Sequence, residues 1–100
     1  MDIQKMLKDA QVMQKSLMQA QADLEKVEVQ GSSGGGLIEI TMNGQGELKG
    51  IKIKKETLEN DTETVEDLIM AAFKDAHTKA AEVSKEKLSK LTGGKDLFPF

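Results

Sequence analysis

The feature that most constrains this chain is a run of apolar or small residues at alternating three- and four-residue spacing near its start. The run comprises Ile3, Met6, Ala10, Met13, Leu17, Ala20, Leu24 and Val27. Helices with this heptad period pair with a left-handed supercoil, and no Gly or Pro interrupts residues 6–26. A helix of roughly 25 residues is about 37 Å long, which exceeds the width of a domain this small. We therefore expect residues 2–26 to form a protruding helix that needs a partner.

The composition favours an oligomer. The chain has 100 residues, enough for one domain, and its only aromatic residues are three Phe. A chain of this size buries a modest share of its surface alone, and twofold dimers are the commonest oligomers. The absence of Cys excludes a disulfide framework and a thiolate zinc site. With no signal peptide and no apolar run of about 18 residues, we expect a soluble, cytoplasmic protein without a membrane partner.

The apolar period changes from helical to alternating near Val27. Residues 31–36 separate the first two predicted strands as a flexible connection, and the third strand is expected at about residues 47–54. Asn43-Gly44 predicts a hairpin with a type I′ turn, lengthened by Gln45-Gly46. A three-stranded antiparallel meander over residues 27–54 follows from the alternating apolar positions Val27, Val29, Ile38, Ile40, Met42, Ile51 and Ile53.

A second helix is predicted over residues 64–92. Thr64, as the N-cap, forms a capping-box pattern with Asp67 after an acidic connector of residues 56–62. Gly93-Gly94 is typical of a helix end. One apolar face of the sheet should pack on the apolar stripe of this helix, which gives an α+β fold. We therefore predict a single domain of residues 1–92 and a flexible tail of residues 93–100.

Three candidate sites have simpler structural explanations. Residues 31–36 read G-x-x-G-G-G and lack the Lys-Ser/Thr pair and the helix that follow a phosphate-binding loop. His77 is the only His and lies beside the apolar stripe, so we interpret it as a packing or surface residue. The acidic residues from Glu56 to Asp67 lack the spacing and the Gly of a calcium loop. We expect no catalytic residue, metal site, cofactor or small-molecule substrate.

The basic residues comprise 14 Lys and no Arg, against 17 acidic residues, for a net charge of −3. Arg is the usual reader of guanine edges, so its absence argues against sequence-specific readout. Lys can still contact phosphate as a point charge. The lysines form three sets along the chain, and these sets are compatible both with a solubility role and with binding to the backbone of a nucleic acid. The sets are Lys5, Lys8 and Lys15; Lys49, Lys52, Lys54 and Lys55; and Lys79, Lys85, Lys87 and Lys90.

The ordered motifs of the chain resemble those of one family, the YbaB/EbfC nucleoid-associated proteins of bacteria. The resemblance covers nearly the whole chain. It rests on Met6-Leu7-Lys8-Asp9-Ala10-Gln11, Met13-Gln14, Gly31-Ser32-Ser33-Gly34-Gly35-Gly36-Leu37, Thr41-Met42-Asn43-Gly44-Gln45-Gly46-Glu47-Leu48, Ile51-Lys52-Ile53, Val65-Glu66-Asp67-Leu68-Ile69-Met70-Ala71-Ala72, Lys87-Leu88 and Leu91-Thr92-Gly93-Gly94.

The resemblance implies an α-β-β-β-α protomer, a homodimer with joined sheets, and helices that project like the arms of tweezers. It also implies a protein of the cytoplasm and nucleoid that binds double-stranded DNA, mainly through the phosphate backbone, and alters its conformation. Nucleoid organisation and gene regulation are the implied roles. The family places DNA contact on the projecting helices, which implies contact residues Lys5, Lys8, Lys15, Lys85, Lys87 and Lys90.

The alternative is a protein-interaction adaptor. Its Met-rich seam, with Met6, Met13 and nearby Met18, would dock a partner helix, because Met surfaces repack easily. DNA binding would then have no physiological role. The sequence leaves open whether the seam pairs within one protomer or across a dimer.

Overall fold

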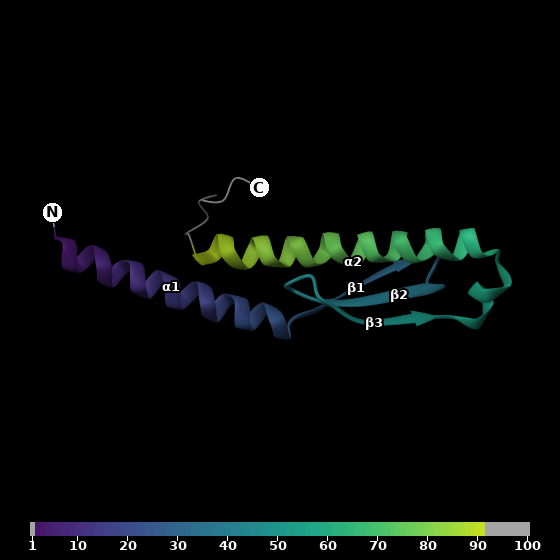
Figure 1. Ribbon diagram of the computed structural model, residues 1–100, viewed down its shortest axis with the longest axis horizontal. Coiled ribbons are helices and arrows are strands. Elements are labelled where there is room, and N and C mark those ends of the chain that lie inside the picture. Colours follow the sequence, from purple (N-terminus) through teal and green to yellow (C-terminus); the bar gives the residue numbers. More distant parts are fainter. Residues whose placement is uncertain (1, 92–100) are drawn as a thin grey trace.

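The computed structural model describes residues 2–91 as two long helices and one antiparallel sheet (Figure 1). The elements are α1 (Ile3–Lys26), β1 (Glu28–Ser33), β2 (Ile38–Asn43), β3 (Leu48–Ile53), the 3₁₀ helix η1 (Lys55–Glu59) and α2 (Thr62–Leu91). Helix α2 runs along the sheet, whereas α1 projects away from it, and the molecule is 68 Å long and 22 by 17 Å across. The predicted α+β architecture is confirmed. The predicted helix end at Gly93-Gly94 and the tail of residues 93–100 lie outside the described residues.

The core forms between the central strand and α2. Ile38, Ile40 and Met42 alternate along β2 on one face and pack against Ala72 and Ala76 of α2. The small side chains on α2 let the helix approach the sheet closely. A thin core of aliphatic side chains results, in agreement with the shortage of aromatic residues.

Gly31 is a strand residue, so the prediction of a flexible connection over residues 31–36 is wrong at its start. It is buried in β1 and pairs with Ile40 of β2. A Cβ at Gly31 would lie 2.2 Å from the backbone nitrogen of Ala76 and 2.5 Å from the carbonyl oxygen of Ala72. Glycine is therefore required here by the contact with α2, and only residues 34–37 form the turn.

The two edges of the sheet differ because α2 lies over β1 and not over β3. The carboxylate of Asp75 accepts a hydrogen bond from the backbone N–H of Ser32 at 3.0 Å, and the ammonium of Lys79 donates to the carbonyl of Gln30, also at 3.0 Å. These contacts occupy polar groups on the outer edge of β1. Such coverage is one way in which proteins protect an edge strand.

Strand β3 continues the apolar face of the sheet beyond the reach of α2. Ile53 pairs with Ile38 and Ile51 with Ile40, so they share the face that forms the core. The side chains of Leu48, Ile51 and Ile53 are nevertheless 55%, 45% and 41% exposed. The protomer therefore leaves an apolar strip uncovered at the β3 edge.

The hairpin between β2 and β3 is confirmed, but its turn is not of type I′. No non-glycine residue of the described chain has a positive φ, and among residues 43–46 only Gly46 does, at 84°. The turn is held by Asn43 instead. Its side-chain oxygen accepts from the N–H groups of Gln45 and Glu47, both at 3.0 Å, and its amide donates to the carboxylate of Glu47. This network satisfies a fully buried polar side chain.

The same turn holds the end of α1. The N–H of Gly44 donates to the carbonyls of Leu24 at 2.8 Å and Val27 at 3.0 Å, and the amide of Gln45 donates to the carbonyl of Gln21 at 2.7 Å. The last carbonyls of a helix have no partner within it. The N–H of Gly44 is shared by the carbonyls of Leu24 and Val27, and Gln45 adds a bond to Gln21; together these bonds fix where α1 leaves the sheet.

Helix α2 begins at Thr62, two residues before the predicted start, so the prediction of Thr64 as the N-cap is wrong. Asp61 precedes the helix, and its carboxylate accepts hydrogen bonds from Thr64. Asp is among the preferred capping residues. The connector also contains η1, which the sequence pattern did not predict, and the hydroxyl of its buried Thr57 donates to the carbonyl of Leu37 at 3.0 Å.

The heptad seam is buried at one end only. Ala20 and Leu24, near the end of α1, are 2% and 3% exposed, because they pack inside the protomer. Ile3, Met6 and Met13 are exposed, as is every residue from 3 to 15, a segment called here the α1 arm. The protruding helix is therefore confirmed. Neither described helix is sufficiently long and apolar to cross a membrane.

Candidate nucleic-acid interface

The lysines of α1 lie on one side of the helix. Lys8, Lys15 and Lys26 are spaced by seven and eleven residues, close to two and three helical turns, and Lys5 lies about one turn before Lys8. All four are exposed. By the same periodicity, Lys8, Lys15 and Lys26 point away from the side that buries Ala20 and Leu24. This surface is called here the α1 basic face; sequence reasoning missed Lys26, which the helical spacing could have revealed.

The predicted lysines of α2 do not share one surface. Lys87 lies on the side of α2 that faces α1, and its ammonium is 3.3 Å from the carboxylate of Asp23. Lys90 lies 3.8 Å from the carboxylate of Glu86. Lys85 lies on the outer side of α2, on the same face as Lys74 three turns earlier, and forms no ion pair within residues 2–91. Of the three, Lys85 is the one available to a ligand without breaking an ion pair.

Acidic residues gather at the opposite end of the molecule from the α1 arm (Figure 1). They belong to η1, the following linker and the first turns of α2, and all are exposed. The side-chain hydrogen bond from Thr64 lowers the pKa of Asp61, so this carboxyl stays ionised at neutral pH. A polyanion would be repelled from this end, which is formed by Glu56, Glu59, Asp61, Glu63, Glu66 and Asp67.

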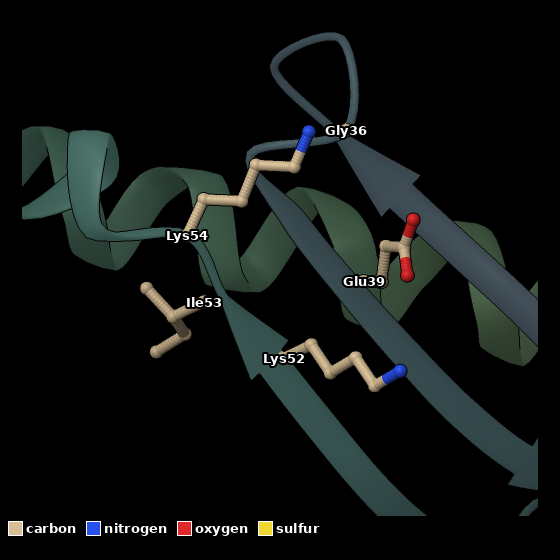
Figure 2. A pocket seen from close by; sticks show the side chains of 5 residues that line it. All are labelled: Gly36, Glu39, Lys52, Ile53 and Lys54. Carbon is tan, nitrogen blue, oxygen red and sulfur yellow. The ribbon is translucent and has the colours of Figure 1, made fainter.

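A shallow hollow of about 340 Å³ lies beside the glycine turn, where the side chains of Lys52, Lys54 and Glu39 gather near Gly36 (Figure 2). Glu39 lies directly across the strand pair from Lys52, so a carboxylate shares the hollow with the two ammonium groups. Strand β2, and no helix, follows the turn. The hollow therefore combines opposite charges and does not form a dedicated phosphate cradle.

His77 stacks on Phe73, with ring centroids 6.0 Å apart, and its ring is 3.8 Å from the position of a Cβ at Gly46. Both side chains are exposed on the flank of α2 that faces the β2–β3 turn. Within residues 2–91, no three Asp, Glu or His side chains are arranged to hold a metal ion. The structure thus places His77 in a packing role at the surface.

A small hollow of about 210 Å³ separates the end of α1 from α2. Leu24, Val27 and Val83 form its apolar floor, and Glu86, Lys87 and Lys90 form its rim. The hollow marks the place where the two helices part. Lys87 and Lys90 of α2 therefore lie beside the end of α1.

The geometry defines a class of protein: a small two-layer α+β protomer with a projecting helix, a lysine-bearing helical face and an acidic opposite end. The model of the YbaB/EbfC DNA-binding family matches residues 1–95. This chain belongs to the YbaB/EbfC family.

Relatives of known name agree with that membership. A nucleoid-associated protein of Legionella pneumophila is 45% identical over 89 residues, which cover 89% of this chain and 80% of that protein. One from Rhodospirillum rubrum is 42% identical over 99 residues, covering 98% and 92%. A crystal structure of an uncharacterized protein from Helicobacter pylori is similar with a TM-score of 0.84 and 27% identity, and covers 93% of this chain and 99% of that one.

Proposed function

We propose that the protein is a nucleoid-associated, homodimeric protein that binds duplex DNA through the phosphate backbone and alters its conformation. The observation that carries the proposal is the α1 basic face, an exposed row of lysines on a helix whose first half, the α1 arm, projects from the protomer (Figure 1). The DNA-binding family and the names of the relatives support it. Lys5, Lys8, Lys15 and Lys85 are the first proposed contacts, with Lys87 and Lys90 available once their ion pairs open.

Backbone contact, and not base readout, follows from the chemistry of the side chains. The chain has no Arg, and Lys acts on phosphate as a point charge without the bidentate geometry that recognises guanine. Each neutralised phosphate releases counterions, so binding should weaken steeply as salt rises. Any preference among DNA sequences would arise from DNA shape and deformability.

The dimer is proposed to form at the uncovered strip of β3 together with the adjacent flank of α2. Ile51 and Ile53 of β3 are exposed beside an edge that nothing covers within residues 2–91, whereas α2 protects the edge of β1. Phe73 and Met70 of α2 are also exposed, at 42% and 56%. Pairing two copies here would join their sheets, bury apolar area and carry two α1 arms on one body.

The acidic end supports the assignment of DNA to the arms. Like charge repels the duplex from η1 and the start of α2, so the lysines of the α1 basic face are the accessible cations farthest from that repulsion. Clamping or bending of DNA would follow from the shape of the dimer that holds it.

The test is a binding titration on random-sequence duplex at two salt concentrations, with the molecular mass measured on the same sample. We expect a dimer whose affinity falls linearly with salt on a logarithmic scale. A variant that combines Lys5→Gln, Lys8→Gln and Lys15→Gln should lose most of the affinity, and adding the same change at Lys26, Lys85, Lys87 and Lys90 should remove the rest.

A matched control carries Lys52→Gln, Lys54→Gln and Lys55→Gln, which removes three lysines near the acidic end. It should bind as the unaltered protein does. Equal losses in the two triple variants would show that net charge, and not the α1 basic face, governs binding.

The adaptor is the second candidate, because Met6, Met13 and Met18 are exposed on α1 at 55%, 40% and 65%. Such a surface adapts readily to a partner helix. A dimer that fails to bind duplex even at low salt would favour this candidate. A protein that co-purifies in stoichiometric amount and is lost on Met6→Lys would establish it.

A further inference from the structure

One ion pair joins the two helices at the base of the α1 arm. The carboxylate oxygen Oδ2 of Asp23 lies 3.3 Å from Nζ of Lys87. The other ion pairs between described residues, Lys79–Asp75 and Lys90–Glu86, each lie within α2. The Asp23–Lys87 pair is therefore the one that connects the arm-bearing helix to the helix packed on the sheet.

Asp23 is held in place and ionised. The amide of Gln19 donates to its Oδ1 at 3.0 Å, while Lys87 lies on Oδ2. The hydrogen bond from Gln19, followed by the one from Lys87, lowers the pKa of Asp23 below its ordinary value. Both side chains of the ion pair are 40% exposed, so a ligand in solvent can reach them.

Asp23 also lies among cations. Lys26 follows it by three residues on the same side of α1 and acts on its charge, as Lys87 does from α2. Lys26 belongs to the α1 basic face. A phosphate of a duplex lying along that face would interact with the same two lysines that act on the carboxylate of Asp23 in the free protein.

We propose that Asp23 is an internal competitor of DNA that withholds Lys87, together with part of the charge of Lys26, from the phosphate backbone. This inference rests on the proposed function. The DNA affinity of the protein would then depend on an acidic residue that does not contact DNA. Without DNA, the carboxylate of Asp23 interacts with Lys87 and Lys26. A DNA phosphate must replace this carboxylate before it can interact with the two lysines.

Competition between Asp23 and DNA phosphate predicts the direction in which DNA affinity changes when Asp23 is replaced. Removing the charge of Asp23 frees Lys87 and Lys26, so affinity should rise and the number of neutralised phosphates should increase. The rise should be modest, about two- to fivefold at low salt, because exposed ion pairs of this kind are weak. The slope of log affinity against log salt should steepen by about 0.9 for each added phosphate contact.

The experiment compares Asp23→Asn with Asp9→Asn in the random-duplex titration at several salt concentrations. Asp9 is an exposed acid on the same helix with no ion pair among residues 2–91, so its variant matches the loss of charge alone. We expect tighter binding and a steeper slope for Asp23→Asn only. Adding Lys87→Gln to Asp23→Asn should cancel most of the gain, and Asp23→Glu should restore the original affinity.

Thermal unfolding of each variant confirms that the fold is intact. Equal gains for Asp23→Asn and Asp9→Asn, or a gain that survives Lys87→Gln, would overturn the inference while leaving DNA binding established. Absence of DNA binding by the unaltered protein and by every variant would instead overturn the proposed function, and the inference with it.

Discussion

Gly31 of β1 lies against the backbone of Ala76 in α2, so close that a single added methyl group would fall 2.2 Å from the Ala76 nitrogen. The obstructing atoms are backbone and cannot rotate aside. The backbones of α2 and β1 are in direct contact here, with no side chain between them. This contact therefore constrains the distance between the helix and the sheet.

Replacement of Gly31 by Ala should therefore destabilise the protein by about 3 kcal/mol or more, at or above the upper end of typical overpacking costs. Urea unfolding followed by circular dichroism measures the change. Gly50→Ala is the control, because a Cβ there meets nothing within 4 Å and φ is not positive; it should stay within about 1 kcal/mol of the original stability. If Gly31→Ala lowers the stability no more than Gly50→Ala does, a shift of α2 must relieve the contact.

Because of Asp75, the free energy of unfolding should fall as the pH is lowered. The hydrogen bond from the N–H of Ser32, followed by that from Lys79, lowers the pKa of Asp75 below its ordinary 3.8. A lowered folded-state pKa contributes stability that is present above 3.8 and lost as pH falls through the folded-state value. Unfolding in urea between about pH 5 and about pH 2 should show this loss, and Asp75→Asn should reduce the pH dependence.

The control for acid sensitivity is Glu82→Gln, an exposed acid on α2 without an ion pair among residues 2–91. Its stability should follow the same pH curve as the unaltered protein. If Asp75→Asn also follows that curve, the protection of the β1 edge does not rest on the charge of Asp75.

Ile51→Lys and Phe73→Glu should each separate the proposed dimer, since both place a charge on the apolar surface formed by β3 and α2. Light scattering during size-exclusion chromatography should show the mass of one chain in place of two. Leu58→Lys is the matched change on η1, where the side chain is 69% exposed and belongs to neither β3 nor α2, and it should remain dimeric. Dimers that persist in all three variants would move the interface to the seam of the α1 arm.

Asp61→Ala should shorten or loosen the start of α2, because the carboxylate that accepts from Thr64 is lost. We expect a fall of a few degrees in the midpoint of thermal unfolding, whereas Thr64→Val should have a smaller effect and Asp61→Asn should be tolerated. A larger effect at Thr64 would support Thr64 as the true cap.

The elements with strong periodicity were predictable from the sequence. The apolar alternation of Ile38, Ile40 and Met42 and the helical spacing of Ala72 and Ala76 place the core correctly. The errors fall where one residue has two possible roles. Gly31 stands in a Gly- and Ser-rich stretch typical of loops, but it is a strand residue in close contact with α2. Asp61 and Thr64 are both suitable N-cap residues for α2, and the sequence pattern led to the wrong one.

The candidate interface was predictable only in part, because spacing along a helix shows which lysines share a face and not which acids lie across from them. Lys8 and Lys15, seven residues apart on α1, lie on one side of the helix and are both exposed. Lys87 of α2 forms an ion pair with Asp23 of α1, 64 residues earlier in the sequence. No local sequence pattern could reveal that contact. The uncovered face of β3 likewise depends on where α2 lies over the sheet.

Every residue of the α1 arm is exposed, so the position of its tip depends on how the other end of α1 is held, where Gly44 and Gln45 donate to the carbonyls of Gln21, Leu24 and Val27. A helix of about 24 residues is roughly 36 Å long, and a rotation of about 10° at its base displaces the tip by roughly 6 Å. That displacement approaches two base-pair steps of a duplex, at about 3.4 Å each. For the proposed DNA contacts, the β2–β3 turn would therefore set where the lysines of the α1 arm meet the duplex, although this turn lies at the other end of the helix.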